Sequence, residues 1–372
     1  MTETFTVTVE PLGTELTCRA DQSVLDACLR NGVWLPHACT HGTCGTCKAE
    51  VLDGEVDFGD ASPYALVDSD RDDGYALMCV ATPKEDIVIE GDVELEEGIE
   101  IYPVRDFTGT IAILDEAAPN VKRMVIDLDE PMDFNPGQYV QLNMPDGDDR
   151  PYSIASSPSE PSRIELHIKR SEGGAATDGW IFKDLNAGDP ISLSGPYGQF
   201  FFHPAKDKPL ILLGSGTGLA PLKSILRHVA ELDDEGEWEH EVVLFHGVAT
   251  GDDLYEHEWL SEFADDREWF TYQPAVSREE FDGRQGRVPV LLTEDFPRAG
   301  GNSAYICGNP AMVEDTMKAL MQARLFPPRH LPRGLLRLRR SSRRRSRGEE
   351  PADQAVGAAC GRASTLRGVR AP

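Results

Sequence analysis

Four of the eight cysteines stand in an arrangement that can bind iron. Four residues separate Cys39 from Cys44, two separate Cys44 from Cys47, and 31 residues lie between Cys47 and Cys79. Thiolates in this spacing are the ligands of a [2Fe–2S] cluster, and the short loop lets one segment supply three of them. The small residues between the cysteines allow backbone N–H groups to turn toward sulfur, where such hydrogen bonds tune the reduction potential.

A zinc site is the main alternative for these four thiols. Zinc sites usually combine two Cys-x-x-Cys pairs, or one such pair with two histidines. This chain contains a single Cys-x-x-Cys, so the pattern favours the iron–sulfur cluster. His37 and His41 flank Cys39, and we expect both to be surface residues near the cluster.

A second group of residues suits a flavin nucleotide. Arg150, Tyr152 and Ser153 share one strand-like segment. Arg can pair bidentately with a pyrophosphate, and a Tyr ring can lie against an isoalloxazine. Lys169 ends a later segment, and the glycine-rich residues 173–177 lead into an apparent helix, whose N-terminus can hold a phosphate. Each piece alone is unspecific, but the three together favour a flavin site.

A glycine loop in a strand–loop–helix segment predicts a second nucleotide site. Gly214, Gly216 and Gly218 permit close approach of the backbone to a pyrophosphate, and Pro221 can begin the following helix. A single glycine turn is weak support, because many α/β units contain one. Cys307 ends a later strand at the carboxyl edge of the expected sheet, where nucleotides bind in such folds.

Length and composition limit the classes of protein. A chain of 372 residues is expected to form two or three domains. No stretch reaches the roughly 18 apolar residues of a membrane span, and the N-terminus lacks the basic and apolar regions of a signal peptide. Eight cysteines, four of them in a cluster motif, fit a reducing compartment. We therefore expect a cytoplasmic protein without membrane association.

Charge is distributed unevenly along the chain. The formal net charge is −28, but residues 324–372 contain 13 Arg and three acidic residues, a net of +10, which leaves −38 for residues 1–323. An acidic body fits either adaptation to high salt or a docking surface for a basic partner. The chain has only nine Lys, which favours salt adaptation. The acidic body argues against binding of nucleic acid.

Changes in residue pattern and composition along the chain divide it into modules. Residues 1–95 combine alternating strands, one helix capped by Ser23 and the cysteine loop, which suits a β-grasp domain. Residues 104–205 contain short strands punctuated by Gly and Pro, which suits an antiparallel β-barrel. Residues 206–326 alternate strands with helices, which predicts a parallel α/β domain. The expected fold class is thus multidomain, α+β with α/β.

The motifs together resemble a known family. R-x-Y-S at residues 150–153, G-x-G-T-G-x-x-P at residues 214–221 and Cys-Gly at residues 307–308 resemble those of NAD(P)H-dependent flavin reductases of the ferredoxin–NADP reductase superfamily. The N-terminal module is similar to a fused plant-type ferredoxin. Stretches such as GVWLPHACTHGTCGTCK and LSGPYGQFF resemble, more narrowly, the reductase components of multicomponent phenol hydroxylases, which serve soluble diiron monooxygenases. The resemblance covers residues 1 to about 326.

The resemblance implies a role for each motif. It implies that the cluster ligands are Cys39, Cys44, Cys47 and Cys79. It implies that FAD is held by Arg150, Tyr152 and Ser153, and its phosphates by Lys169, Gly174 and Thr177. It implies that the phosphates of NADH are held by Gly214, Gly216, Thr217 and Gly218, with Cys307 and Gly308 beside the nicotinamide and Tyr255 near the adenine.

The implied function is electron transfer from NADH through FAD and the cluster to a partner oxygenase. The implied partner is a diiron monooxygenase of the phenol hydroxylase type, which acts on aromatic compounds or alkanes. No acid–base or nucleophilic residue is required, so no catalytic side chain is assigned. A reductase of a Rieske-type ring dioxygenase is the alternative, since it uses the same modules. A metal-binding regulatory protein would differ in class, and visible flavin absorption would exclude it.

The C-terminal segment 327–372 departs from this family. Relatives are expected to end in a short strand with acidic and aromatic residues, whereas here Phe326 is followed by Pro327-Pro328 and an Arg-rich tail. Its composition favours a disordered or frameshifted terminus over a selected basic tail, and it alone suggests nucleic acid binding. Because Pro cannot donate ladder hydrogen bonds, we expect the sheet edge to stay unpaired.

Overall fold

The structure is a computed structural model. It describes residues 3–91, 99–145, 147, 149–200, 202–203, 208–281, 283–326 and, for the backbone, 336–338. Most of the expected tail, residues 327–372, and residues 92–98 near the end of the first module lie outside the described residues.

The N-terminal domain has the β-grasp arrangement that the sequence predicted. Its five-stranded sheet has the order β2-β1-β7-β3-β5, with β1 and β7 parallel and the other pairs antiparallel. The strands are β1 (Thr4–Glu10), β2 (Thr14–Arg19), β3 (Lys48–Asp53), β5 (Tyr75–Leu77) and β7 (Ile87–Glu90). The smaller elements are β4 (Val56–Asp57), β6 (Thr82–Pro83) and α2 (Asp68–Asp72).

Helix α1 (Val24–Arg30) packs on this sheet because its apolar residues share one face. The Ser23 hydroxyl accepts a hydrogen bond from the Asp26 N–H at 3.2 Å, which caps the first turn as predicted. The chain leaves the helix at Asn31, and Gly32 adopts a φ of +72°, a conformation that favours glycine. The cysteine loop begins a few residues later, so α1 and its cap determine where that loop starts.

The middle domain is a six-stranded antiparallel sheet of order β11-β10-β13-β8-β9-β12. Its strands are β8 (Arg105–Ala118), β9 (Val121–Leu128), β10 (Tyr139–Asn143), β11 (Asp149–Ser153), β12 (Arg163–Lys169) and β13 (Pro190–Tyr197). The two edge strands approach each other through an isolated bridge between Ile154 and Leu166. The antiparallel architecture is confirmed, although the sheet curls into an open barrel instead of closing along a full ladder.

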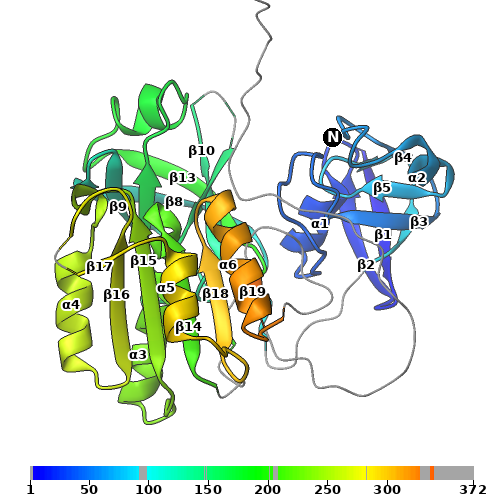
Figure 1. The fold of residues 1–372 in the computed structure, drawn as a ribbon. Helices are drawn as coiled ribbons and strands as arrows, with labels where there is room; N and C mark the ends of the chain where they lie inside the picture. Colours follow the sequence, from blue (N-terminus) through cyan, green and yellow to red (C-terminus); the bar gives the residue numbers. More distant parts are fainter. Residues whose placement is uncertain are drawn as a thin grey trace, which may run out of the picture.

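The third domain is a doubly covered, mainly parallel sheet of order β17-β16-β15-β14-β18-β19 (Figure 1). Its parallel strands are β14 (Leu210–Ser215), β15 (Val242–Val248), β16 (Phe270–Val276), β17 (Arg284–Gln285) and β18 (Ser303–Cys307). The helices are α3 (Leu219–Asp234), α4 (His257–Asp266), α5 (Val288–Asp295) and α6 (Pro310–Gln322).

Strand β14 is buried on both faces because its residues alternate between two cores. Leu210 and Leu212 pack with α3 and α4, whereas Ile211 and Leu213 pack with α5 and α6. This period of two explains why the strand reads as a continuous apolar run in the sequence. The predicted parallel α/β architecture is confirmed, and the carboxyl ends of β14, β15 and β18 meet at one edge.

The expectation of an unpaired sheet edge is wrong. Strand β19 (Leu336–Leu338) pairs antiparallel with β18, with Leu336 opposite Ile306 and Leu338 opposite Ala304. The prediction failed because it extended the effect of Pro327 and Pro328 too far along the chain. Leu336, Arg337 and Leu338 alternate apolar and basic residues, which is a strand-compatible period.

The N-terminal domain contacts the middle domain through α1. The Arg30 guanidinium pairs with both carboxylate oxygens of Asp106 on β8, at 3.0 and 2.8 Å. The Val104 N–H donates to the Leu29 carbonyl at 3.1 Å, and Tyr197 of β13 packs into the N-terminal core. These contacts fix the side of the ferredoxin-like domain that faces the middle domain.

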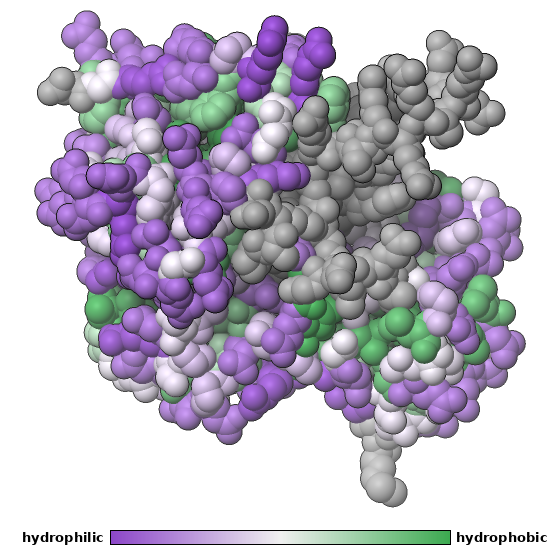
Figure 2. All heavy atoms as spheres, turned by 90° about the horizontal axis from the view of Figure 1, so that it is seen from below, coloured by the Kyte–Doolittle hydropathy of each residue, from purple (hydrophilic) through white to green (hydrophobic). Residues whose placement is uncertain are grey.

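The visible surface is dominated by hydrophilic residues, with small apolar areas between them (Figure 2). Within the described part of the chain, no helix has the length and apolar character needed to cross a membrane.

We expect the acidic body to require salt for stability. Carboxylate repulsion opposes a compact state at low ionic strength and is screened as salt is added. The melting temperature of the protein should therefore rise steadily from dilute buffer to about 1 M KCl. Differential scanning fluorimetry across this series measures the melting temperature. A parallel series with the same molar concentrations of sucrose is the uncharged control. A flat or falling melting temperature would favour the acidic surface as a docking surface for a basic partner.

Candidate functional site

The cysteine loop lies between α1 and β3 and is built from backbone turns. Gly42 and Gly45 adopt φ values of +76° and +77°, which bring backbone N–H groups around toward sulfur. The Gly42 N–H donates to Cys79 Sγ at 3.3 Å, and the Thr43 N–H donates to Cys39 Sγ at 3.4 Å. The predicted hydrogen bonds from the loop backbone to sulfur are therefore present.

The four predicted ligands converge. Side-chain hydrogen bonds join Cys39 to Cys44 and to Cys79, and Cys47 to Cys79. The hydrogen bond with Cys44 lowers the pKa of Cys39, and the one with Cys79 lowers the pKa of Cys47, whereas sharing these protons raises the pKa of Cys44 and of Cys79. Four thiols joined in a chain of neighbouring contacts, with backbone N–H groups turned toward sulfur, fit a [2Fe–2S] cluster.

Of the two histidines beside Cys39, one differs from expectation. His41 is exposed, but His37 is buried, with 3% of its surface accessible. Its Nδ1 lies 2.8 Å from the Leu35 carbonyl, and burial lowers the pKa of His37 to about 4. His37 is thus a neutral packing residue that also contacts the Trp34 ring, with centroids 4.7 Å apart. The sequence could not show this, because a His beside a loop carries no burial signal.

The predicted flavin residues lie on the two edge strands of the middle domain. Arg150, Tyr152 and Ser153 are on β11, and Lys169 is the last residue of β12. Burial raises the pKa of Tyr152 to about 12, so its hydroxyl stays protonated. Because β11 and β12 meet at the Ile154 bridge, the structure brings these segments to one end of the curled sheet.

The remaining two predicted flavin residues, Gly174 and Thr177, lie in a tight loop after β12. The Thr177 hydroxyl accepts from the Ser171 N–H at 2.9 Å and lies 3.1 Å from the Ser171 carbonyl. A Cβ at Gly174 would lie 2.9 Å from that same carbonyl, so a larger residue would push the loop open. Gly174 and Thr177 therefore determine the shape of the loop.

The glycine loop of the third domain interlocks with the Cys307-Gly308 segment. A Cβ at Gly218 would lie 2.2 Å from the Cys307 carbonyl oxygen, and a Cβ at Gly308 would lie 2.2 Å from Ser215 Oγ. The Asn309 N–H donates to Ser215 Oγ at 2.9 Å. These glycines are required for close backbone contact at the carboxyl edge, where the predicted NADH residues from β14 and β18 come together. Gly214 lies near the end of β14, and Thr217 lies in the 3-10 turn Gly216–Gly218 that follows it.

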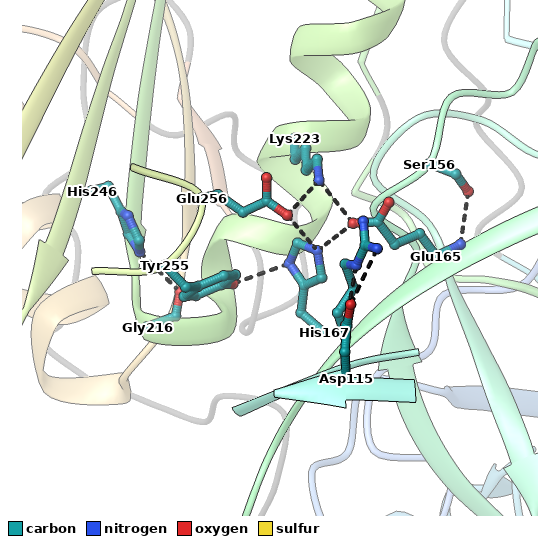
Figure 3. A network of polar contacts seen from close by, with 10 residues as sticks. Asp115, Ser156, Glu165, His167, Gly216, Lys223, His246, Tyr255 and Glu256 are labelled. Atoms are coloured by element: carbon teal, nitrogen blue, oxygen red, sulfur yellow. Dashed lines mark hydrogen bonds and ion pairs between the residues drawn. The ribbon is translucent and has the colours of Figure 1, made fainter. Parts of the chain in front are cut away.

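Tyr255 does not lie where the resemblance implied. Only 3% of its surface is accessible, and its hydroxyl points beneath the glycine loop toward His167 Nδ1, 3.0 Å away (Figure 3). Burial raises the pKa of Tyr255 well above its ordinary value, so the phenol is neutral. A side chain held in this way has no face free for adenine.

The same view shows a buried ion cluster that sequence reasoning missed (Figure 3). Lys223 Nζ lies 2.8 Å from Glu165 Oε1 and 2.7 Å from Glu256 Oε1, and His167 Nε2 donates to Glu165 at 2.7 Å. Burial alone would raise the pKa of Glu165, but the His167 hydrogen bond and the Lys223 charge hold it below its ordinary value. The available signal was a Lys within the apolar stretch LAPLKSIL and a Glu within RIELHIK.

Glu165, His167 and Glu256 are residue types that could also bind a metal ion. The ammonium of Lys223 contacts both carboxylates, however, and supplies the positive charge at that position. The cluster is therefore a structural ion network that joins β12 of the middle domain to α3 of the third domain.

Family models match all three parts of the chain. Residues 7–84 match the 2Fe-2S iron-sulfur cluster binding domain, residues 111–202 the oxidoreductase FAD-binding domain, and residues 212–318 the oxidoreductase NAD-binding domain.

Curated relatives and solved structures agree over most of the chain. It is 42% identical to the reductase component of phenol 2-monooxygenase from Pseudomonas sp. strain CF600, over 87% of this chain and 92% of that protein. It is 40% identical to the reductase subunit of an aromatic O-demethylase from Amycolatopsis, over 88% and 97%. A crystal structure of an Amycolatopsis cytochrome P450 reductase superposes with a TM-score of 0.80, at 40% identity, covering 88% of this chain and 97% of that one.

These likenesses agree with the geometry of the three sites. The chain is an oxidoreductase that transfers electrons from NADH through FAD to a [2Fe–2S] cluster. It belongs to the family of iron–sulfur flavoprotein reductases that serve as the reductase components of oxygenases.

Proposed function

We propose that this protein supplies electrons to an aromatic monooxygenase of the phenol hydroxylase type, whose active centre is diiron. The observation that carries the proposal is the 42% and 40% identity to two phenol hydroxylase reductase components over 87% of the chain. NADH gives up two electrons as a hydride and the cluster carries one at a time, so a flavin between them performs the conversion. The protein's own task is to align these groups and to keep water and oxygen away.

The proposed division of labour follows the three domains, taken as residues 1–95, 104–205 and 206–326. The cluster ligands would be Cys39, Cys44, Cys47 and Cys79. The FAD residues would be Arg150, Tyr152, Ser153, Lys169, Gly174 and Thr177. The NADH residues would be Gly214, Gly216, Thr217, Gly218, Cys307 and Gly308.

Each proposed role has a physical basis in the geometry. Arg150 offers charge to a pyrophosphate at the end of the curled sheet, and Tyr152 offers a neutral ring. The N-terminus of α3 follows the glycine loop directly, so its backbone N–H groups and helix dipole favour a phosphate there. The seven free cysteines among the described residues suit a reducing cytoplasm.

A cytochrome P450 is the second candidate partner. The aromatic O-demethylase reductase subunit is 40% identical over 97% of its length, and a structure described as a cytochrome P450 reductase has a TM-score of 0.80. A Rieske-type dioxygenase has weaker support, because the naphthalene dioxygenase reductase components are 32% and 30% identical.

Anaerobic titration with NADH tests the cofactor assignment. Stepwise additions should bleach the flavin absorption and produce the EPR signal of a reduced [2Fe–2S] cluster, one cluster per FAD. The partner is tested by coupling the reduced protein to a phenol hydroxylase and, separately, to an O-demethylating P450. Faster electron transfer to the diiron enzyme supports the proposal, and faster transfer to the P450 replaces it with the second candidate.

We expect NADH to be preferred over NADPH. The segment after β15 is a turn at Gly251–Asp253, and the Gly251 N–H donates to the Glu279 carboxylate at 2.5 Å. Asp252, Asp253 and Glu279 thus surround the carboxyl edge with negative charge, which disfavours a 2′-phosphate. We expect kcat/KM for NADH to exceed that for NADPH by at least about tenfold. Steady-state reduction of cytochrome c by each nucleotide measures this ratio.

Two variants sharpen this test. Glu279→Gln should reduce the preference for NADH, because it removes one of the negative charges. Glu314→Gln is the matched control, since Glu314 lies on α6 in an exposed pair with Lys318. Equal kcat/KM values for the two nucleotides in the unmodified protein would contradict the prediction, and Arg278, which follows β16 at the same edge, would then be the residue to examine.

A further inference from the structure

Two buried side chains, His246 and Tyr255, contact the Gly216 carbonyl of the glycine loop from the protein interior (Figure 3). His246 Nε2 lies 3.3 Å from this oxygen, and the Tyr255 hydroxyl lies 3.5 Å from it. His246 comes from β15, where it stands opposite Gly214 in the parallel ladder, and none of its surface is accessible. Two side chains from outside the loop therefore meet one carbonyl group within it.

The proton positions follow from the partners. Burial lowers the pKa of His246 to about 4, so its imidazole is neutral near pH 7. A carbonyl oxygen can only accept, so Nε2 must carry the ring proton and donate it to Gly216. This leaves His246 Nδ1 buried without a hydrogen-bond partner among the described residues. A buried polar atom of this kind lowers the stability of the fold, because its lost hydration is not replaced.

Tyr255 is anchored on its other side by the ion cluster. His167 Nε2 donates a hydrogen bond to the Glu165 carboxylate, and burial lowers the pKa of His167, so its Nδ1 is an acceptor. The Tyr255 hydroxyl has one proton, which it shares in a three-centre hydrogen bond between His167 Nδ1 at 3.0 Å and the Gly216 carbonyl at 3.5 Å. Glu165 is joined through Lys223 to Glu256, which is the next residue after Tyr255. The contacts thus form a closed ring that connects β12, α3 and the segment under the glycine loop.

This arrangement determines how one peptide group faces. The peptide between Gly216 and Thr217 is trans, so its carbonyl and its N–H point in opposite directions. Holding the carbonyl toward the protein interior keeps the Thr217 N–H on the outer side of the loop. The Leu219 N–H also reaches the Gly216 carbonyl within the 3-10 turn, but only the side chains tie the loop to β15 and β12.

We propose that His246 and Tyr255 are positioning residues for NADH. They orient the Gly216–Thr217 peptide so that its N–H faces the pyrophosphate, and the ring through His167, Glu165, Lys223 and Glu256 holds this loop in register with the flavin domain. The inference rests on the proposed binding of NADH at the glycine loop, and it adds residues that do not touch the nucleotide.

Variants of the whole protein with its cofactors test the role of His246. His246→Leu removes the donor that ties the Gly216 carbonyl to β15 and leaves the orientation of this peptide less fixed, so KM for NADH should rise about tenfold, while kcat changes by less than about twofold. His246→Gln places an amide N–H near the position of Nε2 and should stay within about twofold of the unmodified protein. The rescue by Gln is the result that a general packing role would not produce.

Tyr255→Phe removes one hydroxyl and should raise KM for NADH by about three- to fivefold. Tyr272→Phe is the matched control, because the Tyr272 hydroxyl lies in the same domain but bonds His257 Nδ1 at 3.4 Å, and its KM should not change. FAD content from visible absorption and the melting temperature are measured for each variant. If His246→Leu does not fold, the comparison of Tyr255→Phe with Tyr272→Phe decides.

Three outcomes are separable. An unchanged KM in His246→Leu and Tyr255→Phe, or an equal rise in the Leu and Gln variants of His246, would overturn the positioning role. Gly218→Ala places a Cβ 2.2 Å from the Cys307 carbonyl and should raise KM whichever residues orient the loop. If Gly218→Ala raises KM and His246→Leu does not, only the present inference fails. If neither changes KM, NADH does not bind at this loop and the proposed site itself fails.

Discussion

Replacing Cys44 by Ser is expected to abolish NADH-dependent reduction of cytochrome c while direct reduction of the flavin by NADH continues. A serine hydroxyl is a far poorer iron ligand than a thiolate, so electrons would stop at the flavin. We expect the rate with cytochrome c to fall by at least about 100-fold. Ferricyanide, which can accept electrons from the flavin, should still be reduced at close to the original rate.

The structure makes Cys44 a suitable position for this test. Its side chain is exposed, and its Sγ bonds the Thr46 hydroxyl at 3.3 Å, so the change in packing is small. Cys18→Ser is the matched control: Cys18 is a free thiol of the same domain whose Sγ donates to the Gln22 carbonyl at 3.4 Å, a contact that a hydroxyl can keep. If both activities disappear together in Cys44→Ser with the flavin retained, the order of electron transfer is wrong.

Replacing Lys223 by Met should strongly destabilise the third domain. The accessible fractions of the Lys223, Glu165 and Glu256 side chains are 3%, 8% and 13%, so removing the ammonium leaves two buried carboxylates close together. Breaking a buried ion pair in this way costs about 3–5 kcal/mol. Urea unfolding followed by tryptophan fluorescence should show a lower midpoint, since Lys223 also lies over the Trp259 ring.

Two further variants isolate the charge. Lys318→Met removes a Lys from an exposed pair with Glu314 and should leave the midpoint unchanged, because exposed pairs contribute little. Adding Glu165→Gln to Lys223→Met removes one uncompensated carboxylate and should recover part of the lost stability. A midpoint that is equally low with and without Glu165→Gln would mean that lost packing, and not the buried charge, is responsible.

Features that could be predicted without the structure are those encoded by short sequence motifs. Cys39, Cys44 and Cys47 lie in one short loop, so their spacing alone constrains the geometry of the ligands. Strand β14 packs on both faces, and a strand buried in this way reads as an apolar run next to its glycine loop. Motifs of this kind carry their chemistry within a few residues.

The failures share a different physical origin. The expected positions of His37 and Tyr255 were derived from nearby motifs and from the family resemblance. Whether such a side chain faces a ligand or the core depends, however, on how other elements pack against it. How far the edges of the middle sheet approach each other also depends on distant segments, since Ile154, next to β11, bridges to Leu166 of β12. The pairing of Leu336–Leu338 with β18 likewise depends on a contact between distant segments.

The sequence by itself predicted the three-domain order, the group of four cysteines and the two nucleotide loops, because each motif, apart from the distant Cys79, rests on residue types at short separations. Only the tertiary structure decided the ring of Glu165, Lys223 and Glu256 with His167 and Tyr255. Its members are up to 91 residues apart and come from two domains, and their charges are tolerable only when folding brings them together, since each alone would be too costly to bury.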